Sequence, residues 1–197
     1  MHFWRYNKDN DEKGGLLVEG ETLFRRYLSG EKGAFDEIVS LYRENLIFFI
    51  NRYTHDLDAA EDLSQDVFLV LLMAPRKYDF RVKLKTYLFT IARNKALNYM
   101  KKHKRETLMG DDLSEKSEEY AAFESEMFRR DERRALFQAI ERLKPDYAEV
   151  LHLLYFEEMS YLEAGGVMKK SQKQIENLAM RARQALRAIM TKEGYVR

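Results

Sequence analysis

The chain has 197 residues, 45% of them hydrophobic, with 34 basic and 33 acidic side chains and a formal net charge of +1. This length and composition favour a folded protein of one ordinary domain or two small ones and exclude a disordered polymer. The chain has no cysteine, which excludes disulfides and cysteine-ligated metals, and it has no apolar run near the roughly 20 residues of a membrane span and no signal-peptide pattern. We therefore expect a cytoplasmic protein without membrane insertion.

Helical periodicity runs through almost the whole sequence, whereas convincing period-two alternation is missing, so we predict an all-α fold. Residues 1–20 are expected to form a polar N-terminal tail, and residues 21–104 a first domain that opens with a short helix around 23–28. A second helix follows, with apolar side chains at the i, i+3, i+4 and i+7 spacing of a core-facing stripe. They are Phe35, Ile38, Val39, Tyr42, Leu46, Phe49, Ile50 and Tyr53.

The third helix is predicted to begin at a capping box formed by Asp58 and Glu61 and to end before Pro75. Its polar side carries Asp62, Gln65 and Asp66 at i, i+3 and i+4, opposite an apolar side. Taken alone, such an acidic face indicates a solvated surface more often than a docking site for a partner.

A long helix is predicted over residues 83–104, after a turn-rich segment at 75–83. Its outer side is basic, and four aromatic residues lie beside it or just ahead of it: Tyr78, Phe80, Tyr87 and Phe89. Cations next to exposed rings suit single-stranded DNA, because each unstacked base gains roughly 1–3 kcal/mol by stacking on an aromatic side chain. The alternative is that these rings fill the hydrophobic core.

Residues 105–131 are rich in acids and poor in apolar side chains, which predicts a flexible linker before a second domain at 132–192 and a C-terminal tail at 193–197. Two capping boxes, Ser160 with Glu163 and Ser171 with Gln174, begin two consecutive helices in this domain. A short helix, a tight turn and a longer basic helix form the helix-turn-helix pattern.

In that motif the second helix enters the major groove of DNA, with residues near its N-terminus against the base edges. The candidate contacts here are Lys170, Ser171, Gln172, Lys173, Asn177 and Arg181. A lone basic helix at this place would more often be a solvated amphipathic face, but the preceding capped helix and turn favour DNA binding.

Catalysis is not expected from this sequence. The four histidines are scattered without metal-ligand spacing, and neither a glycine-rich phosphate loop nor a nucleophile motif is present. We predict that the protein is not an enzyme and needs neither a metal nor a cofactor.

Three segments together resemble the sigma-70 family, specifically its compact extracytoplasmic-function (ECF) class, which keeps the second and fourth conserved regions. Residues 59–68, AAEDLSQDVF, are similar to the acidic motif that grips the clamp helices of the polymerase β′ subunit. Residues 84–98, LKTYLFTIARNKALN, resemble the helix that melts and reads the minus ten element, and 75–83 its specificity loop. Ser160, Glu163 and residues 181–186 resemble the helix-turn-helix that reads the minus thirty-five element.

This resemblance implies two small helical domains, a sigma region 2 bundle and a sigma region 4 helix-turn-helix, joined by a flexible acidic linker. It implies core RNA polymerase (β′ clamp helices and β flap), promoter DNA and an anti-sigma factor as partners. Polymerase binding would fall to Asp62, Gln65 and Asp66. The minus ten DNA contacts would be Tyr78, Phe80, Tyr87, Arg93, Asn94, Asn98, Lys101 and Lys102.

Several positions depart from the family pattern. Tyr87 stands where a tryptophan is common, which keeps a ring in place. Gly165 replaces an alanine and is followed by a second glycine, each costing roughly 0.5–1 kcal/mol inside a helix. Lys169 replaces the turn glycine, and Glu176 lies where a lysine often faces DNA, so its charge should repel phosphate. We therefore expect the minus ten contact to be stronger than the upstream contact.

The predicted function is that of a sigma factor, which binds core RNA polymerase and directs promoter-specific transcription initiation by recognising and melting promoter DNA. The main alternative is a stand-alone helix-turn-helix regulator that binds its operator without polymerase. A more distant alternative is a helical scaffold that binds only protein.

Overall fold

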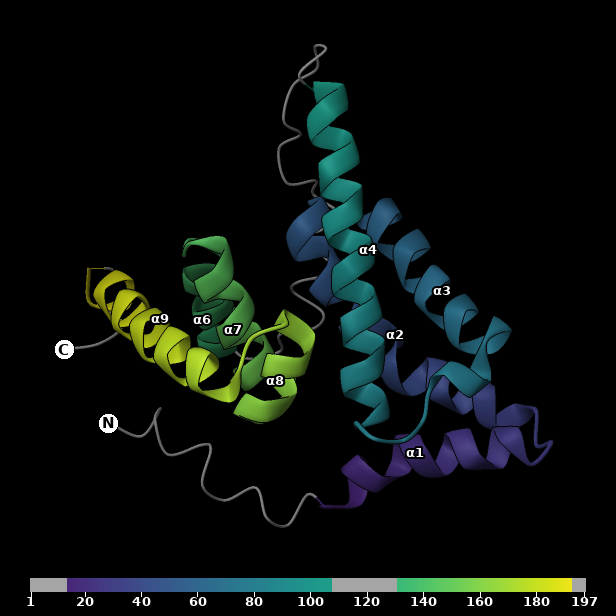
Figure 1. Ribbon diagram of the computed structural model, residues 1–197. Helices are drawn as coiled ribbons and strands as arrows, with labels where there is room; N and C mark the ends of the chain where they lie inside the picture. Colours follow the sequence, from purple (N-terminus) through teal and green to yellow (C-terminus); the bar gives the residue numbers. More distant parts are fainter. Residues whose placement is uncertain (1–13, 108–130, 193–197) are drawn as a thin grey trace.

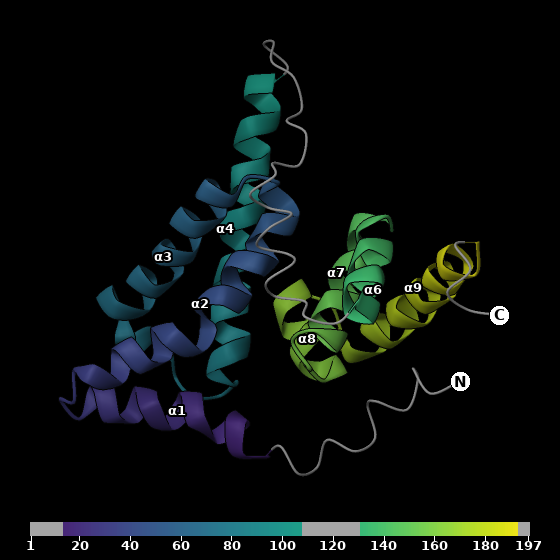
Figure 2. The ribbon, with the colours of Figure 1, turned by 180° about the vertical axis from the view of Figure 1, so that it is seen from behind.

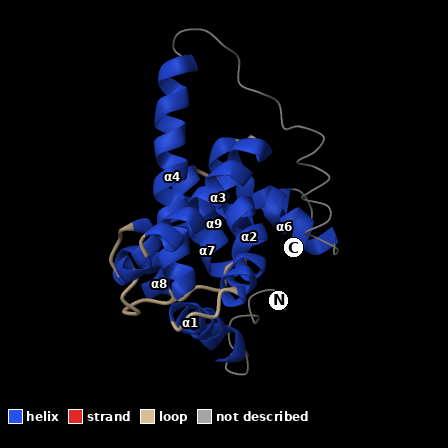
Figure 3. Ribbon diagram, turned by 90° about the vertical axis from the view of Figure 1, so that its right-hand side faces the viewer, coloured by secondary structure: helices blue, strands red, loops and turns tan. Residues whose placement is uncertain are grey.

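The computed structural model describes residues 14–107 and 131–192, and this part of the chain is entirely helical apart from turns and loops (Figure 1, Figure 3). The all-α prediction is confirmed. The N-terminal helices are α1 (Gly14–Leu28), α2 (Gly33–Thr54), α3 (Leu57–Met73), the 3-10 turn η3 (Pro75–Lys77) and α4 (Leu84–Thr107). The C-terminal helices are α6 (Asp131–Glu141), α7 (Pro145–Tyr155), α8 (Tyr161–Met168) and α9 (Gln172–Lys192).

The predicted tails and linker fall largely outside the described residues, which omit 1–13, 108–130 and 193–197. Helix α1 begins at Gly14, inside the segment predicted as a tail, and α4 continues to Thr107, three residues beyond the predicted domain end. The domain boundaries therefore remain predictions.

The first domain is organised around α2, with α1, α3 and α4 packed against it (Figure 2). The predicted stripe on α2 supplies fully buried Ile38, Leu46, Phe49 and Ile50, which meet Phe89 and Leu88 of α4 in the same core. Burying such a side chain contributes roughly 1.5–3 kcal/mol, so this stripe stabilises the domain substantially.

Helix α3 starts earlier than predicted. Its N-cap is Asp56, whose backbone is extended (φ −140°) and whose carboxylate accepts a 3.1 Å hydrogen bond from the N–H of Ala59. The predicted start at Asp58 is wrong, because Asp58 already lies in the first helical turn, where its charge suits the helix dipole. The predicted end is confirmed, since α3 stops at Met73 and Pro75 opens the 3-10 turn.

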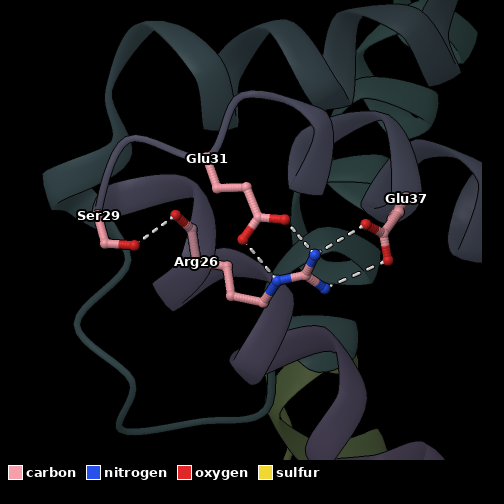
Figure 4. A network of polar contacts seen from close by, with 4 residues as sticks. All are labelled: Arg26, Ser29, Glu31 and Glu37. Carbon is pink, nitrogen blue, oxygen red and sulfur yellow. Dashed lines mark hydrogen bonds and ion pairs between the residues drawn. The ribbon is translucent and has the colours of Figure 1, made fainter.

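The turn between α1 and α2 is held by one guanidinium group (Figure 4). Arg26 bonds the carboxylates of both Glu31 and Glu37, with its Nε 2.8 Å from Glu31 Oε2 and Nη2 3.1 Å from Glu37 Oε1. The hydroxyl of Ser29 donates a 2.7 Å hydrogen bond back to the carbonyl of Arg26. These exposed contacts set the angle between the two helices more than they stabilise the fold.

The second domain contains the predicted helix-turn-helix, formed by α8 and α9. Both capping boxes are confirmed: the side chain and backbone of Ser160 bond Glu163 reciprocally, and Ser171 pairs in the same way with Gln174. Lys169, at the end of α8, adopts a left-handed backbone conformation (φ 54°). This conformation is energetically unfavourable for a residue other than glycine, as expected from the sequence. A non-glycine residue in that conformation costs about 1 kcal/mol.

Gly165 has a structural reason that the sequence did not reveal. A Cβ atom at this position would lie 2.6 Å from the carbonyl oxygen of Lys170, far inside van der Waals contact. The backbone of Lys170 lies this close to α8 because its N–H donates a 3.0 Å hydrogen bond to the Gly165 carbonyl. The glycine therefore allows the tight turn of the motif, which offsets its poor helix propensity.

The two domains pack against one another along α4 and α8, with α9 on the far side of the second domain from α4 (Figure 1). Buried apolar residues of both domains form one continuous cluster. This packing was not predicted from the sequence. No helix in the described part of the chain combines the length and apolarity needed to cross a membrane.

Candidate nucleic-acid and polymerase interfaces

The predicted polymerase-binding stripe lies on the outer face of α3. Asp62 and Gln65 are exposed, whereas Asp66 is half-exposed and its Oδ2 lies 2.7 Å from the ammonium of Lys95 on α4. The third predicted residue is thus already paired within the domain, and an approaching protein would meet Asp62 and Gln65 first.

The same face of α3 continues with apolar side chains that the sequence analysis did not include. Leu69, Leu72 and Met73 are exposed by 48%, 41% and 82%. Positions 62, 65, 69 and 72 follow one another at three- and four-residue steps, so helical spacing from the acidic stripe could have identified them. Exposed apolar side chains beside acids are typical of a protein-binding surface.

The four aromatic residues ahead of α4 and in its first turns divide into buried and accessible rings. Tyr78 is only 3% exposed and its hydroxyl donates a 2.8 Å hydrogen bond to the carbonyl of Val82, so in this conformation its ring is not accessible to a base. Phe89 is fully buried as well. The ring of Tyr78 packs 5.5 Å from that of Phe24, and the ring of Phe89 packs 5.1 Å from that of Phe49, which places both in the aromatic core.

Phe80 and Tyr87 are the two predicted rings that remain partly accessible. Phe80 has a left-handed backbone (φ 63°), which is rare for a bulky residue, and its ring lies 4.1 Å from the guanidinium carbon of Arg25. Strained backbone of this kind is concentrated at functional sites. The exposed polar side chains of the loop are Arg76, Lys77, Asp79 and Arg81.

Helix α4 presents its predicted DNA contacts unevenly. Asn98, Lys101 and Lys102 are exposed and Asn94 is half-buried, all in the C-terminal part of the helix. Arg93 is not free: its Nε lies 2.5 Å from Glu149 Oε1 of α7, and its side chain is 14% exposed. Burial opposes the charge of this guanidinium, but the Glu149 carboxylate outweighs it and raises the pKa of Arg93 further.

Two further cations, Lys83 directly ahead of α4 and Lys85 in its first turn, are engaged by the second domain, and neither was assigned a role from the sequence. Lys83 Nζ lies 2.7 Å from Glu163 Oε1, and Lys85 Nζ lies 2.8 Å from Glu157 Oε2. No local sequence signal identifies such pairs, because their partners are more than 70 residues away.

The predicted upstream-DNA residues are on the outside of the second domain. Ser171, Gln172, Lys173, Asn177 and Arg181 are exposed. Lys170 is half-buried, with its Nζ 3.6 Å from Asp146 Oδ2. Lys170, Asn177 and Arg181 line one shallow hollow together with Gln174 and Leu178, so half of the predicted set is gathered in one place.

Glu176 holds two of the other predicted contacts. Its carboxylate accepts a 3.1 Å hydrogen bond from Gln172 Nε2 and lies 3.3 Å from Lys173 Nζ. The carboxylate of Glu176 is expected to repel phosphate, and it also binds the ammonium of Lys173 and the amide of Gln172. Both effects oppose the approach of phosphate to this face of α9.

Arg183, which belongs to the segment similar to the family motif, has a structural role. Its Nε donates to the hydroxyl of Tyr155 at 3.0 Å and its Nη2 to the hydroxyl of Tyr161 at 2.6 Å, which ties α9 to α7 and α8. The described residues include no cluster of histidines and carboxylates that could hold a metal ion.

Comparison with known protein families gives two matches. Residues 38–106 match the family described as "Sigma-70 region 2", and residues 133–186 match "Sigma-70, region 4". The matched segments coincide with the two helical units that carry the interfaces described above.

Curated relatives are similar over most of their length. The ECF RNA polymerase sigma factor SigM of Bacillus subtilis is 33% identical over 78% of this chain and 93% of its own. The RNA polymerase sigma-H factor of Pseudomonas aeruginosa is 27% identical over 85% of this chain and 92% of its own.

Two solved structures have the same fold. The sigma factor RpoE of Bartonella quintana, in complex with the anti-sigma factor NepR, has a TM-score of 0.64 and 25% identity over 80% of this chain and 96% of its own. CnrH in complex with the cytosolic domain of CnrY has a TM-score of 0.65 at 21% identity, over 88% of this chain and 98% of its own.

Proposed function

The chain belongs to the sigma-70 family as an ECF sigma factor that directs promoter-specific transcription initiation, and from this premise we propose which of its surfaces carry each step. Its partners are core RNA polymerase and promoter DNA. The family is one of non-catalytic DNA-binding proteins, and we propose that this chain likewise catalyses no reaction and works in the cytoplasm with the polymerase.

Core polymerase binds the outer face of α3. Asp62 and Gln65 supply polar contacts to the β′ clamp helices, and exposed Leu69, Leu72 and Met73 supply the apolar area beside them. A mixed apolar and acidic face of this kind can contribute more to affinity than carboxylates alone, because exposed ion pairs are worth only about 0–1 kcal/mol each.

The minus ten element is captured by the loop ahead of α4 and by α4 itself. Phe80 and Tyr87 offer rings on which an extruded base can stack, and Asn94, Asn98, Lys101 and Lys102 track the strand. Tyr78 supports this loop from inside the core instead of contacting DNA. The observation that carries this assignment is the strained, half-exposed Phe80 beside Arg25.

The minus thirty-five element is bound by the N-terminal half of α9. The hollow lined by Lys170, Asn177 and Arg181 receives the DNA backbone and base edges. Glu176 makes this the weaker of the two contacts, and the β flap of the polymerase holds the domain in place.

An anti-sigma factor is the third proposed partner. The similar solved sigma factors were captured with anti-sigma partners, namely RpoE with NepR and CnrH with CnrY. For this chain, the surfaces that such a protein would cover are the outer face of α3 and the cations of α4.

Reconstituted transcription tests this function. The chain is added to core polymerase, and transcripts started on fragmented genomic DNA are sequenced. Promoter-specific starts are expected with the wild-type chain and should fall at least tenfold with Asp62→Arg, whereas Glu44→Arg, an equal charge change at an exposed position of α2, should leave them unchanged. Specific binding of genomic DNA by the chain alone, with no effect on where core polymerase starts, would instead indicate a stand-alone regulator.

A further inference from the structure

We propose that Arg25 of α1 is a further DNA-binding residue in minus ten recognition, and that an extruded non-template base stacks on its guanidinium group. This inference deepens the proposed role of the loop ahead of α4 and rests on it. Helix α1 lies outside residues 38–106, the segment that matches sigma-70 region 2. The contact therefore comes from a helix that the family match does not include.

One face of α1 meets the minus ten loop at three positions. Glu21, Phe24 and Arg25 have the i, i+3 and i+4 spacing that places side chains on the same side of a helix. The Glu21 carboxylate accepts a hydrogen bond from the N–H of Leu84, and the buried Phe24 ring lies 5.9 Å from that of Phe80. Glu21 is half-buried, so Arg25 is the exposed member of this face.

Arg25 stands at the outer end of a row of neighbouring rings. Its guanidinium carbon lies 4.1 Å from the centre of the Phe80 ring. The Phe80 ring is 4.7 Å from that of Tyr78, and the Tyr78 ring is 5.1 Å from that of Tyr87 on α4. A base that stacks on the exposed side of Arg25 extends this row from α4 across the loop to α1.

The guanidinium of Arg25 makes no ion pair within the described part of the chain, unlike neighbouring arginines. Arg26 is paired with a carboxylate of the α1–α2 turn, and Arg81 Nε lies 3.1 Å from Asp79 Oδ2. An arginine has five N–H donors around a flat plane, so its face can stack on a base while its edge donates to a phosphate. Arg25 keeps both its face and its donors available for a nucleic acid.

The loop holds the Phe80 ring under Arg25 before any DNA arrives. Phe80 has a left-handed backbone (φ 63°), a conformation that is unfavourable for a bulky residue. The next turn is fixed by Asp79, whose Oδ1 accepts a 3.1 Å hydrogen bond from the N–H of Arg81. A site that is already in its binding conformation loses less entropy when a ligand binds.

Two other roles for Arg25 lead to different results on substitution. If its charge alone attracted phosphate, lysine would replace it without loss. If it only supported the Phe80 ring, its loss would destabilise the first domain. Stacking requires the guanidinium plane, so Arg25→Lys, which keeps the charge and removes the plane, separates these roles from base stacking.

Binding of forked promoter DNA by the holoenzyme tests the stacking role. The promoter is one found by sequencing the reconstituted transcripts, and its non-template minus ten segment is left single-stranded. Each base of that segment is replaced in turn by an abasic site. The position at which wild-type holoenzyme loses the most affinity, about tenfold or more for one stacked base, identifies the extruded base.

Arg25→Lys and Arg25→Ala should each weaken binding of the intact fork by about fivefold or more, because the base loses its stacking partner. On the fork that is abasic at the extruded position, Arg25→Lys should bind as the wild-type protein does. Arg43→Lys, the same change at an exposed arginine of α2, should alter binding of neither fork.

Three outcomes would overturn the inference. Arg25→Lys that binds the intact fork as tightly as wild-type protein would show a contact by charge alone. Equal losses of affinity by Arg25→Lys on the intact and abasic forks would exclude stacking on that base. A marked fall in the thermal unfolding temperature of both Arg25 variants would assign the residue a structural role, whereas its exposure predicts no such fall.

The same data separate the inference from the proposed function. A wild-type holoenzyme that shows no abasic effect at any position of the minus ten segment would refute base capture by this loop. A strong abasic effect in the wild-type protein that is unchanged in both Arg25 variants would leave the proposed function intact and overturn the inference alone.

Discussion

The carboxylate of Glu21, on α1, accepts a 2.5 Å hydrogen bond from the backbone N–H of Leu84, the first residue of α4. The first N–H groups of a helix have no partner within the helix, so a side chain from 63 residues away acts as the cap of α4. The end of the minus ten loop is thereby tied to the α1–α2 unit.

Glu21→Ala should destabilise the first domain, because the Leu84 N–H loses its acceptor and the loop loses its anchor. The expected loss is about 1 kcal/mol, as for the removal of other helix caps. Urea unfolding followed by circular dichroism would measure it. Glu19→Ala, an exposed carboxylate on the same helix, is the matched control, and an equal loss in both variants would contradict the capping role.

Gly165→Ala should destabilise the second domain, although helix propensity alone predicts a gain of roughly 0.5–1 kcal/mol. The added methyl group would lie 2.6 Å from the Lys170 carbonyl oxygen, so the turn of the helix-turn-helix must open. We expect a net loss of about 1–3 kcal/mol, as for other overpacked sites. Thermal unfolding of Gly165→Ala beside Gly33→Ala, where the new Cβ meets open space, gives the sign directly; a stabilised Gly165→Ala variant would refute this account.

The features predicted correctly from the sequence are local ones. Ser160 and Glu163 are three residues apart, and the reciprocal bonds of their capping box depend on little besides that spacing. The buried stripe of α2 was predicted for a similar reason, since helical periodicity by itself identifies the core-facing side.

Side-chain contacts between residues far apart in the chain could not be predicted from the sequence. Arg93 and Glu149 are 56 residues apart, and a basic residue destined for DNA has the same local sequence as one destined for a carboxylate. Tyr78 illustrates the same limit, because an aromatic residue in a loop can face solvent or the core equally well by composition. The structure gives Arg93 and Tyr78 partners within the chain, and the predicted DNA and polymerase contacts stay predictions.

Glu176→Ala should strengthen upstream DNA binding by the holoenzyme. The change removes a negative charge near the phosphates and releases Lys173 and Gln172 from their bonds to this carboxylate. A gain of about 1 kcal/mol, or roughly fivefold in affinity, is expected for one charge of this kind. Fluorescence anisotropy with a duplex that carries only the upstream element would measure it, with Glu44→Ala as the control for net charge. Unchanged affinity would mean that α9 does not approach DNA at Glu176.

Domain closure, the packing of the two domains against one another, should weaken as the pH falls, because His152 is buried at the interface. Burial lowers the pKa of His152 below the ordinary value of 6.5, against the opposing effect of Glu157, whose Oε1 lies 3.4 Å from His152 Nε2. Arg52 also disfavours the protonated ring, whereas Glu141 favours it. The closed state therefore binds a proton less readily than the open state, in which the ring meets water.

The sign follows from this difference in proton binding. Above pH 6.5 the ring is mostly neutral in both states and closure changes little. Below 6.5 the open state takes up the proton more readily than the closed state, so the equilibrium constant for closure falls, by at most about tenfold per pH unit for a single proton. The pKa of Glu157 is lowered by Lys85 and His152 against the effect of burial, so its contribution is lost only below its ordinary value of 4.5. The change in domain closure between pH 6.5 and 5 is therefore assigned to the protonation of His152.

Energy transfer between a fluorescent donor and acceptor at Ser40→Cys and Ala188→Cys, followed from pH 7.5 to 5, measures this dependence. Wild-type protein should lose transfer below pH 6.5, and His152→Gln, which cannot titrate, should give a flat response over the same range. Circular dichroism at each pH keeps opening separate from unfolding, since opening leaves the helices intact. The interface carboxylates with a lowered pKa, Glu157 and Glu163, do not begin to titrate above pH 5, so a response in this range is assigned to His152. A wild-type response that is flat to pH 5, or one that is equally steep in His152→Gln, would show that this imidazole does not control closure.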